Sequence, residues 1–158
     1  MIFKLPIGDW SKDGHNQCDF YTVDTNIPTF KELVDLCLKV DKLYNIQSLC
    51  GDYEENYLNS EQAVVFYNLG IDLEKYFDQE AAKDHNHQPI MDEYGDPAIH
   101  LVCWDTEKFA NFILDLFVCT EKGATFLIVN EDIPTLDDWS KEKPEGSTIP
   151  NFGYGLHS

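Results

Sequence analysis

The sequence predicts an α+β fold, with a mixed β-sheet and helices packed against it, in a single domain that spans residues 1–158. A chain of 158 residues has the length of one compact domain. Its apolar content of 43% and aromatic content of 13% are typical of globular proteins. Short strand-like and longer helix-like apolar patterns follow each other without any internal repeat that we could find, which favours a sheet covered by helices.

The N-terminal segment predicts a β-hairpin. Residues 2–8 (IFKLPIG) have the length and apolar content of a strand, and their proline suits a sheet edge. Residues 18–24 (CDFYTVD) are rich in the aromatic and β-branched types that favour strands. Because the stretch 9–17 is polar and turn-forming, we expect it to join the two strands as a long loop.

Three helices are expected in the next part of the chain. Thr29 and Glu32 have the spacing of a capping box, and apolar residues then recur at helical spacing over 29–44. A second helix is predicted over 60–69, where Gly70 ends it. We expect a short third helix over 72–82.

The C-terminal half predicts a parallel β-α-β unit. The polar segment 83–97 is expected to be a loop, and the nearly continuous apolar run 98–104 predicts a strand covered on both faces. A helix at 105–123 and a second apolar strand at 125–129 follow with short connections, which is the pattern of a parallel crossover. The segment 131–158 is expected to be irregular and packed on the domain.

The charge of the chain restricts its partners. There are 29 acidic and 11 basic residues, all of the latter lysines, and the formal net charge is −18. Arginine, the preferred side chain for binding phosphate and carboxylate, is absent. We therefore expect no binding to nucleic acid or to anionic membranes, and attraction to a basic protein or to a cation. The alternative is that the acidity only keeps the protein soluble.

The N-terminus and the cysteines predict a cytoplasmic protein. No signal peptide and no apolar run long enough to span a membrane is visible. The five cysteines include no CxxC pair, and most lie in apolar patterns, so we expect small buried side chains in a reducing compartment.

Three clusters of carboxylates and large aromatic residues predict a partner-binding surface. They consist of Asp52, Tyr53, Glu54, Glu55 and Tyr57, of Asp92, Glu93 and Tyr94, and of Asp137, Asp138 and Trp139. Carboxylates attract a basic partner and pair with its cations, while tyrosine and tryptophan supply anchors that become buried on binding. The alternative is that these aromatic side chains pack inward and close the core from the loops.

The polar loop between the first two strands is a candidate metal site. It carries oxygen donors at alternate positions followed by Gly14, which resembles the first half of an EF-hand calcium loop. The candidate metal-site residues of this loop are Asp9, Ser11, Asp13 and His15. However, Phe20 stands where a bidentate glutamate belongs, so Asp19 or a distant carboxylate would have to complete a calcium site. The alternative is a hairpin loop without metal.

A zinc site is the second metal hypothesis. His15 and Cys18 would be joined by His85 and His87 if the two loops that carry them meet. The chain has no complete zinc-binding spacing, and alternate histidines in a polar loop are commonly just hydrated.

Taken together, these patterns favour a small, acidic, non-enzymatic protein-binding module. An inhibitor or immunity-type protein that masks a basic surface of its partner is the most concrete form. No phosphate loop, nucleophile elbow or other catalytic motif is visible, so no catalytic residue is assigned. The alternative is a metal-dependent enzyme or metal-binding domain that uses the Asp9–Asp19 loop, and a third hypothesis is a structural subunit of a larger assembly.

Overall fold

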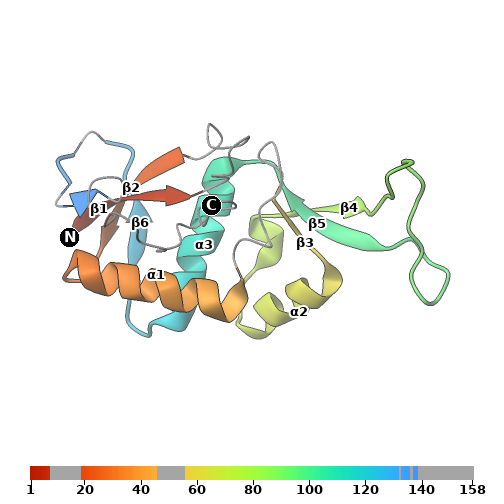
Figure 1. Cartoon of the computed structure of the whole chain (residues 1–158), viewed down its shortest axis with the longest axis horizontal. Coiled ribbons are helices and arrows are strands. Elements are labelled where there is room, and N and C mark those ends of the chain that lie inside the picture. Colours follow the sequence, from red (N-terminus) through yellow and green to blue (C-terminus); the bar gives the residue numbers. More distant parts are fainter. Residues whose placement is uncertain (8–18, 46–55, 132, 136, 139–158) are drawn as a thin grey trace, which may run out of the picture.

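Helix α3 (Thr106–Thr120) lies between two β-sheets in the computed structural model of the protein (Figure 1). The structure describes residues 1–7, 19–45, 56–131, 133–135 and 137–138. Within them, one sheet has four strands, in the order Phe126–Ile128 (β6), Asp19–Thr25 (β2), Ile2–Ile7 (β1) and Asp137–Asp138 (β7). The other has three strands, in the order Asn56–Leu58 (β3), Ile99–Cys103 (β5) and Asp78–Ala81 (β4). Together with three α-helices, the two sheets make one small α+β domain, as the sequence predicts at this level.

The predicted N-terminal hairpin is confirmed. Strand β1 (Ile2–Ile7) pairs antiparallel with β2 (Asp19–Thr25), in a register that runs from Ile2 opposite Asp24 to Ile7 opposite Asp19. In β1 the buried Phe3 and Leu5 flank the partly exposed Lys4, which is the alternation expected when one face of a sheet covers a core.

Two short strands complete the first sheet. Strand β6 (Phe126–Ile128) pairs antiparallel with β2, and β7 (Asp137–Asp138) pairs parallel with β1. The predicted segment 131–158 therefore contributes one strand. Its residues 139–158 lie outside the described part of the chain.

The second sheet is built around β5. Strand β5 (Ile99–Cys103) lies between β3 (Asn56–Leu58) and β4 (Asp78–Ala81), and both pairings are antiparallel. The prediction that this central strand is covered on both faces holds only for its C-terminal end. Val102 and Cys103 are buried, whereas Ile99 is exposed.

The first two predicted helices are confirmed. Helix α1 (Phe30–Tyr44) begins at Thr29, whose Oγ1 accepts a hydrogen bond from the Glu32 backbone N–H at 3.2 Å. Helix α2 (Ser60–Asn68) begins at the predicted residue and is capped by Asn59 in a reciprocal pair with Gln62. Both sets of hydrogen bonds satisfy amides that have no partner inside the helix.

The core is continuous from one sheet to the other because α3 contributes apolar side chains on most of its circumference. Its buried residues are Phe109, Ala110, Phe112, Ile113, Leu114, Leu116 and Phe117. The ring of Phe112 is 5.2 Å from that of Phe66 in α2 and 5.0 Å from that of Phe77, both edge to face. None of the helices in the described part of the chain has the length and apolar character needed to cross a membrane.

The predicted parallel β-α-β unit is wrong. The two strands that flank α3 belong to different sheets, since β5 pairs with β3 and β4 whereas β6 pairs with β2. A crossover helix covers one face of one sheet and needs only one apolar stripe. Because α3 is buried on more than one side, it separates two sheets instead.

The predicted helix over residues 72–82 is also wrong. A single turn of 3-10 helix, η3 (Leu73–Lys75), is followed by the edge strand β4. Buried Leu73, Tyr76 and Phe77 fix this turn against the core, and the chain then extends to pair with β5. Here the pairing of β4 with β5 outweighs the weak local preference of these residues for a helix.

We expect Phe112→Ala to destabilise the protein strongly, because it removes the ring that joins the helices across the core. A fully buried phenylalanine typically contributes about 3–5 kcal/mol to the free energy of unfolding. The measurement is urea unfolding followed by circular dichroism. Leu43→Ala, at an exposed position of α1, is the control and should change the free energy by less than about 0.5 kcal/mol. Equal effects of the two substitutions would contradict this view of the core.

Candidate functional site

The most prominent described feature outside the core is an arm formed by residues 82–98. It connects the end of β4 to the start of β5, and its two loops extend in different directions beyond the second sheet (Figure 1). We call residues 83–89 the first lobe and residues 91–97 the second lobe. The sequence predicts a loop over residues 83–97, and the structure shows that it consists of two lobes with defined turns.

The first lobe is organised by Asp84. Its carboxylate Oδ1 accepts hydrogen bonds from the backbone N–H groups of Asn86 at 2.8 Å and Gln88 at 3.0 Å. Its own backbone N–H donates to the carbonyl oxygen of Gln88. His87 adopts a left-handed conformation with φ of 61°, which closes the turn.

The second lobe repeats this arrangement eight residues later. Asp92 Oδ1 accepts from the backbone N–H groups of Tyr94 at 2.8 Å and Asp96 at 3.0 Å, and Gly95 takes the left-handed position with φ of 81°. Aspartate at the second position and proline at the last position recur in both lobes, at Asp84 and Asp92 and at Pro89 and Pro97. Our sequence analysis missed this repeat, although aligning the two aspartate–proline pairs reveals it.

A ring of backbone hydrogen bonds fixes the base of the arm. The Ala82 N–H donates to the Ala98 carbonyl at 2.9 Å, the Ala98 N–H to the Ile90 carbonyl at 2.8 Å, and the Ile90 N–H to the Ala82 carbonyl at 3.0 Å. Residues 82, 90 and 98 are spaced eight residues apart, which is the length of the repeat. The arm is thus held by local hydrogen bonds rather than by a hydrophobic core, and its geometry is largely set before any partner binds.

Large apolar side chains are displayed on this arm. Tyr94 at the tip of the second lobe is 82% exposed, Met91 is 58% exposed, and Ile90 between the lobes is 43% exposed. Single exposed apolar residues are ordinary on protein surfaces, but several on one projecting element are typical of an interaction site.

The arm is acidic. Residues 82–98 contain four carboxylates and one lysine, and therefore carry a net charge of −3 with neutral histidines. No ion pair neutralises these carboxylates among the residues that the structure describes. Three of them, at Asp92, Glu93 and Asp96, are in the same lobe as Tyr94. Negative charge and an apolar anchor are therefore displayed together.

The structure places one of the three predicted aromatic–acidic clusters on this site. Asp92, Glu93 and Tyr94 are exposed on the second lobe, and the fold adds Ile90, Met91 and Asp96, which the sequence analysis did not include. The side chains of the other two clusters lie outside the described residues. Only the backbone of Tyr57 in β3 and of Asp137 and Asp138 in β7 is placed. Their binding roles stay predictions.

The predicted metal-site residues Asp9, Ser11, Asp13 and His15 all lie outside the described residues, as does Cys18. His85 and His87 of the zinc hypothesis are exposed in the first lobe. Across the described part of the chain, no group of three His, Cys, Asp or Glu side chains is arranged to hold a metal ion. The metal hypothesis for the Asp9–Asp19 loop stays a prediction.

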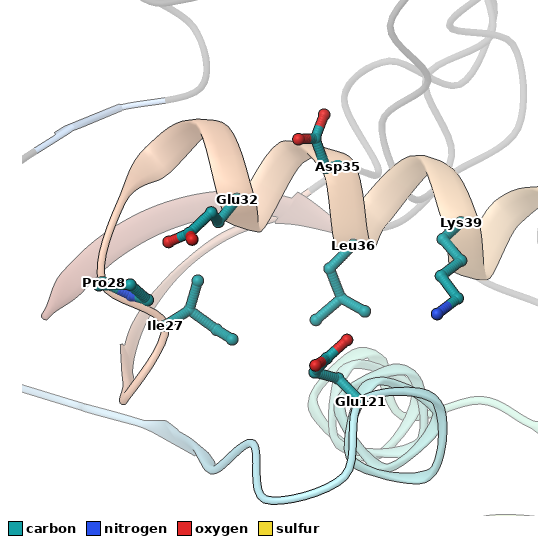
Figure 2. Close-up of a pocket in the computed structure, with 7 residues that line it drawn as sticks. All are labelled: Ile27, Pro28, Glu32, Asp35, Leu36, Lys39 and Glu121. Atoms are coloured by element: carbon teal, nitrogen blue, oxygen red, sulfur yellow. The ribbon is translucent and has the colours of Figure 1, made fainter.

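A pocket of about 340 Å³ lies between α1 and the end of α3 (Figure 2). Leu36 and Ile27 form its apolar part, while the side chains of Lys39 and Glu121 face each other across it and Asp35 points away. Glu32 Oε2 accepts a hydrogen bond from Thr29 Oγ1 at 3.1 Å and is thereby engaged in capping the helix. The pocket thus combines charges of both signs and has no evident chemical preference.

The described cysteines are poor nucleophiles. Burial raises the pKa of the Cys37 thiol well above its usual value, and burial likewise raises the pKa of Cys103. Cys119 is exposed, contrary to the expectation of buried cysteines, and partial burial together with the Asp115 charge raises its pKa as well. All three thiols are therefore protonated near neutral pH.

Tyr76 and Asp115 form a partly buried pair that connects the end of η3 to α3. The Tyr76 hydroxyl donates a hydrogen bond to Asp115 Oδ2. Burial, the bond to Asp115 and the negative charges of Asp115 and Asp72 all raise the pKa of the Tyr76 hydroxyl far above its usual value. This tyrosine remains a hydrogen-bond donor over the whole physiological pH range.

No protein family model, no curated protein and no solved structure matches the chain.

Replacing Asp92 by alanine should open the second lobe, because the amides of Tyr94 and Asp96 lose their acceptor. We expect hydrogen exchange at these two amides to accelerate about tenfold, with little change in global stability. Glu93→Ala is the matched control, since it removes a neighbouring carboxylate that accepts no hydrogen bond from the described residues. Equal exchange rates in the two variants would show that the carboxylate does not organise the lobe.

The Tyr76 pair should make the protein sensitive to alkali. The folded protein retains the phenol proton while the unfolded chain releases it near the ordinary pKa of 10.0, so the free energy of unfolding should fall as pH rises beyond that value. Urea unfolding at increasing pH measures this. The buried thiols of Cys37 and Cys103, whose ordinary pKa is 9.0, also lower the free energy of unfolding as the pH rises. Both thiols are present in the wild type and in the Tyr76→Phe variant, so their effect is common to the two. The free energy of unfolding of Tyr76→Phe should therefore decline less steeply with pH than that of the wild type. Parallel curves would contradict the raised pKa of Tyr76.

Proposed function

We propose that the protein is a small acidic binding module that acts in the cytoplasm by masking a basic surface of a protein partner. Its most concrete form is an inhibitor or immunity-type protein. The observation that supports this proposal is the arm of residues 82–98, which projects from the domain and displays Tyr94 and Met91 among carboxylates that form no ion pair with a described residue.

Preorganisation favours this role. An interface loop that must become ordered on binding loses conformational entropy, which weakens affinity. In the arm, Asp84 and Asp92 already accept the amide hydrogen bonds of their lobes, and the ring through residues 82, 90 and 98 closes the base. Binding therefore requires little further ordering of the backbone.

Electrostatics favours a basic partner. The chain carries a formal net charge of −18 and the arm a net charge of −3, so the field attracts cationic proteins and accelerates their encounter. Phosphate-rich partners are repelled by the same field. Once contact is made, the arm carboxylates can pair with lysine and arginine side chains at the rim of the interface.

Apolar anchoring would supply most of the affinity. Tyrosine is among the residues that contribute most to protein interfaces, because its ring buries a large area while its hydroxyl remains hydrogen-bonded. At 82% exposure the Tyr94 side chain has most of its surface available for such burial. An element that extends from a rigid domain can enter a cleft of the partner, which is the geometry that an inhibitor needs.

A site-specific cross-linking experiment tests the proposal. A photoreactive amino acid in place of Glu93 should capture a basic protein in cells that make this chain, whereas the same group in place of Val64 on α2 should not. The captured protein is then purified and its affinity measured by calorimetry at increasing salt. We expect affinity to fall with ionic strength and Tyr94→Ala to weaken binding by about 10-fold to 100-fold.

The matched control is Tyr67→Ala, which removes an exposed tyrosine from α2 and should leave the affinity unchanged. The proposal fails if affinity does not depend on ionic strength, if the two tyrosine substitutions have equal effects, or if the captured protein is acidic.

A further inference from the structure

A second pocket, separate from the arm, lies beside the Tyr76–Asp115 pair. It has a volume of about 420 Å³, within the range of small-molecule sites. It is lined by Lys75, Tyr76, Lys108, Asn111, Leu114, Asp115, Val118 and Phe126, which come from η3, α3 and β6. The arm contributes none of these residues.

Two residues of the pocket lining, Lys75 and Lys108, are cationic. Within the described residues neither lysine takes part in an ion pair, and the Lys75 Nζ lies 5.7 Å from the centre of the Tyr76 ring. The chain has only eleven lysines against 29 acidic residues. Because both lysines line one pocket, they can bind a carboxylate there.

Asp115 and Asn111 supply hydrogen-bond acceptors to the pocket lining. Asp115 uses Oδ2 to accept from Tyr76, which leaves Oδ1 available. Asn111 donates from Nδ2 to the Glu107 carbonyl at 3.1 Å, and its Oδ1 accepts no hydrogen bond from a described residue. A carboxylate and an amide oxygen together suit an ammonium group, which offers three donors.

The remaining lining is apolar. Leu114 is buried, while Val118 and Phe126 retain exposed surface at the pocket. The Phe126 ring is held in place by an edge-to-face contact with Phe117 at 5.2 Å. A ligand side chain placed against these residues would gain from burying apolar surface.

We propose that this pocket binds a free amino acid with an apolar side chain. Lys75 and Lys108 hold the α-carboxylate, Asp115 and Asn111 accept from the α-ammonium group, and Leu114, Val118 and Phe126 contact the side chain. The arm and its protein partner take no part in this site.

The charge of the whole chain favours a zwitterion over a simple anion. An anion approaching the pocket would have to overcome the repulsion of a protein with net charge −18. An amino acid has no net charge, so it is not repelled at long range. At short range its two charges each meet an opposite charge in the pocket.

The test is an NMR titration of the isotope-labelled protein with L-leucine. We expect saturable shifts at the amides of Lys75, Asn111 and Asp115, with a millimolar or lower dissociation constant. Leucinamide lacks the carboxylate and 4-methylpentanoate lacks the ammonium group. Each should bind more weakly than L-leucine by a factor of about ten or more. Glycine, without an apolar side chain, should also bind more weakly.

Three variants locate the site. Lys75→Met and Lys108→Met should each weaken L-leucine binding about tenfold, and Asp115→Asn, which keeps an acceptor for Tyr76, should do the same. Lys39→Met, in the pocket between α1 and α3, is the control and should bind normally. Spectra of the free variants show whether each is folded.

The proposal is overturned if L-leucine causes no saturable shift in the folded wild-type protein. It is also overturned if 4-methylpentanoate or leucinamide binds as tightly as L-leucine, or if folded Lys75→Met, Lys108→Met and Asp115→Asn all bind L-leucine normally. None of these outcomes bears on the arm, whose function is measured with a protein partner.

Discussion

The burial of α3 on more than one side is the constraint on which the arrangement of the domain depends. A helix with a single apolar stripe can be satisfied by one sheet, but the aromatic and aliphatic residues of α3 need neighbours around most of its circumference. The hairpin sheet with α1 covers one part of this surface, and the second sheet with α2 covers another. Edge-to-face contacts centred on Phe112 join these layers into one core.

The arm is stabilised by a different kind of interaction. No residue of 82–98 is buried, so the hydrophobic effect contributes little to its conformation. Aspartate carboxylates that accept backbone amides hold the lobes, and backbone hydrogen bonds close the base. Because the core does not depend on these side chains, the arm can display acidic and apolar groups at its tip without loss of stability in the rest of the domain. The pocket beside Tyr76 and Asp115, in contrast, is formed by core elements and takes its geometry from their packing.

Elements with strong local signals were predictable from the sequence. The strands of the N-terminal hairpin are rich in apolar, aromatic and β-branched residues, and the helices over 29–44 and 105–123 begin with a capping side chain followed by apolar residues at helical spacing. For the candidate site, the sequence identified Asp92, Glu93 and Tyr94 by composition alone. It did not identify Met91 or the pocket lysines Lys75 and Lys108, because an isolated methionine or lysine has no local pattern that distinguishes a site from ordinary surface.

By itself, the sequence determined the α+β class, the N-terminal hairpin, the main helices and the strongly acidic character of the protein. These properties follow from spacing, capping and charge, all of which act over a few residues or need only counting. Only the tertiary structure decided that β5 and β6 lie in different sheets, that residues 78–81 form a strand, and that the arm is a repeated pair of turns. The pairing of strands is determined by contacts between residues far apart in the chain. The local sequence pattern of an apolar strand is the same whichever sheet it joins.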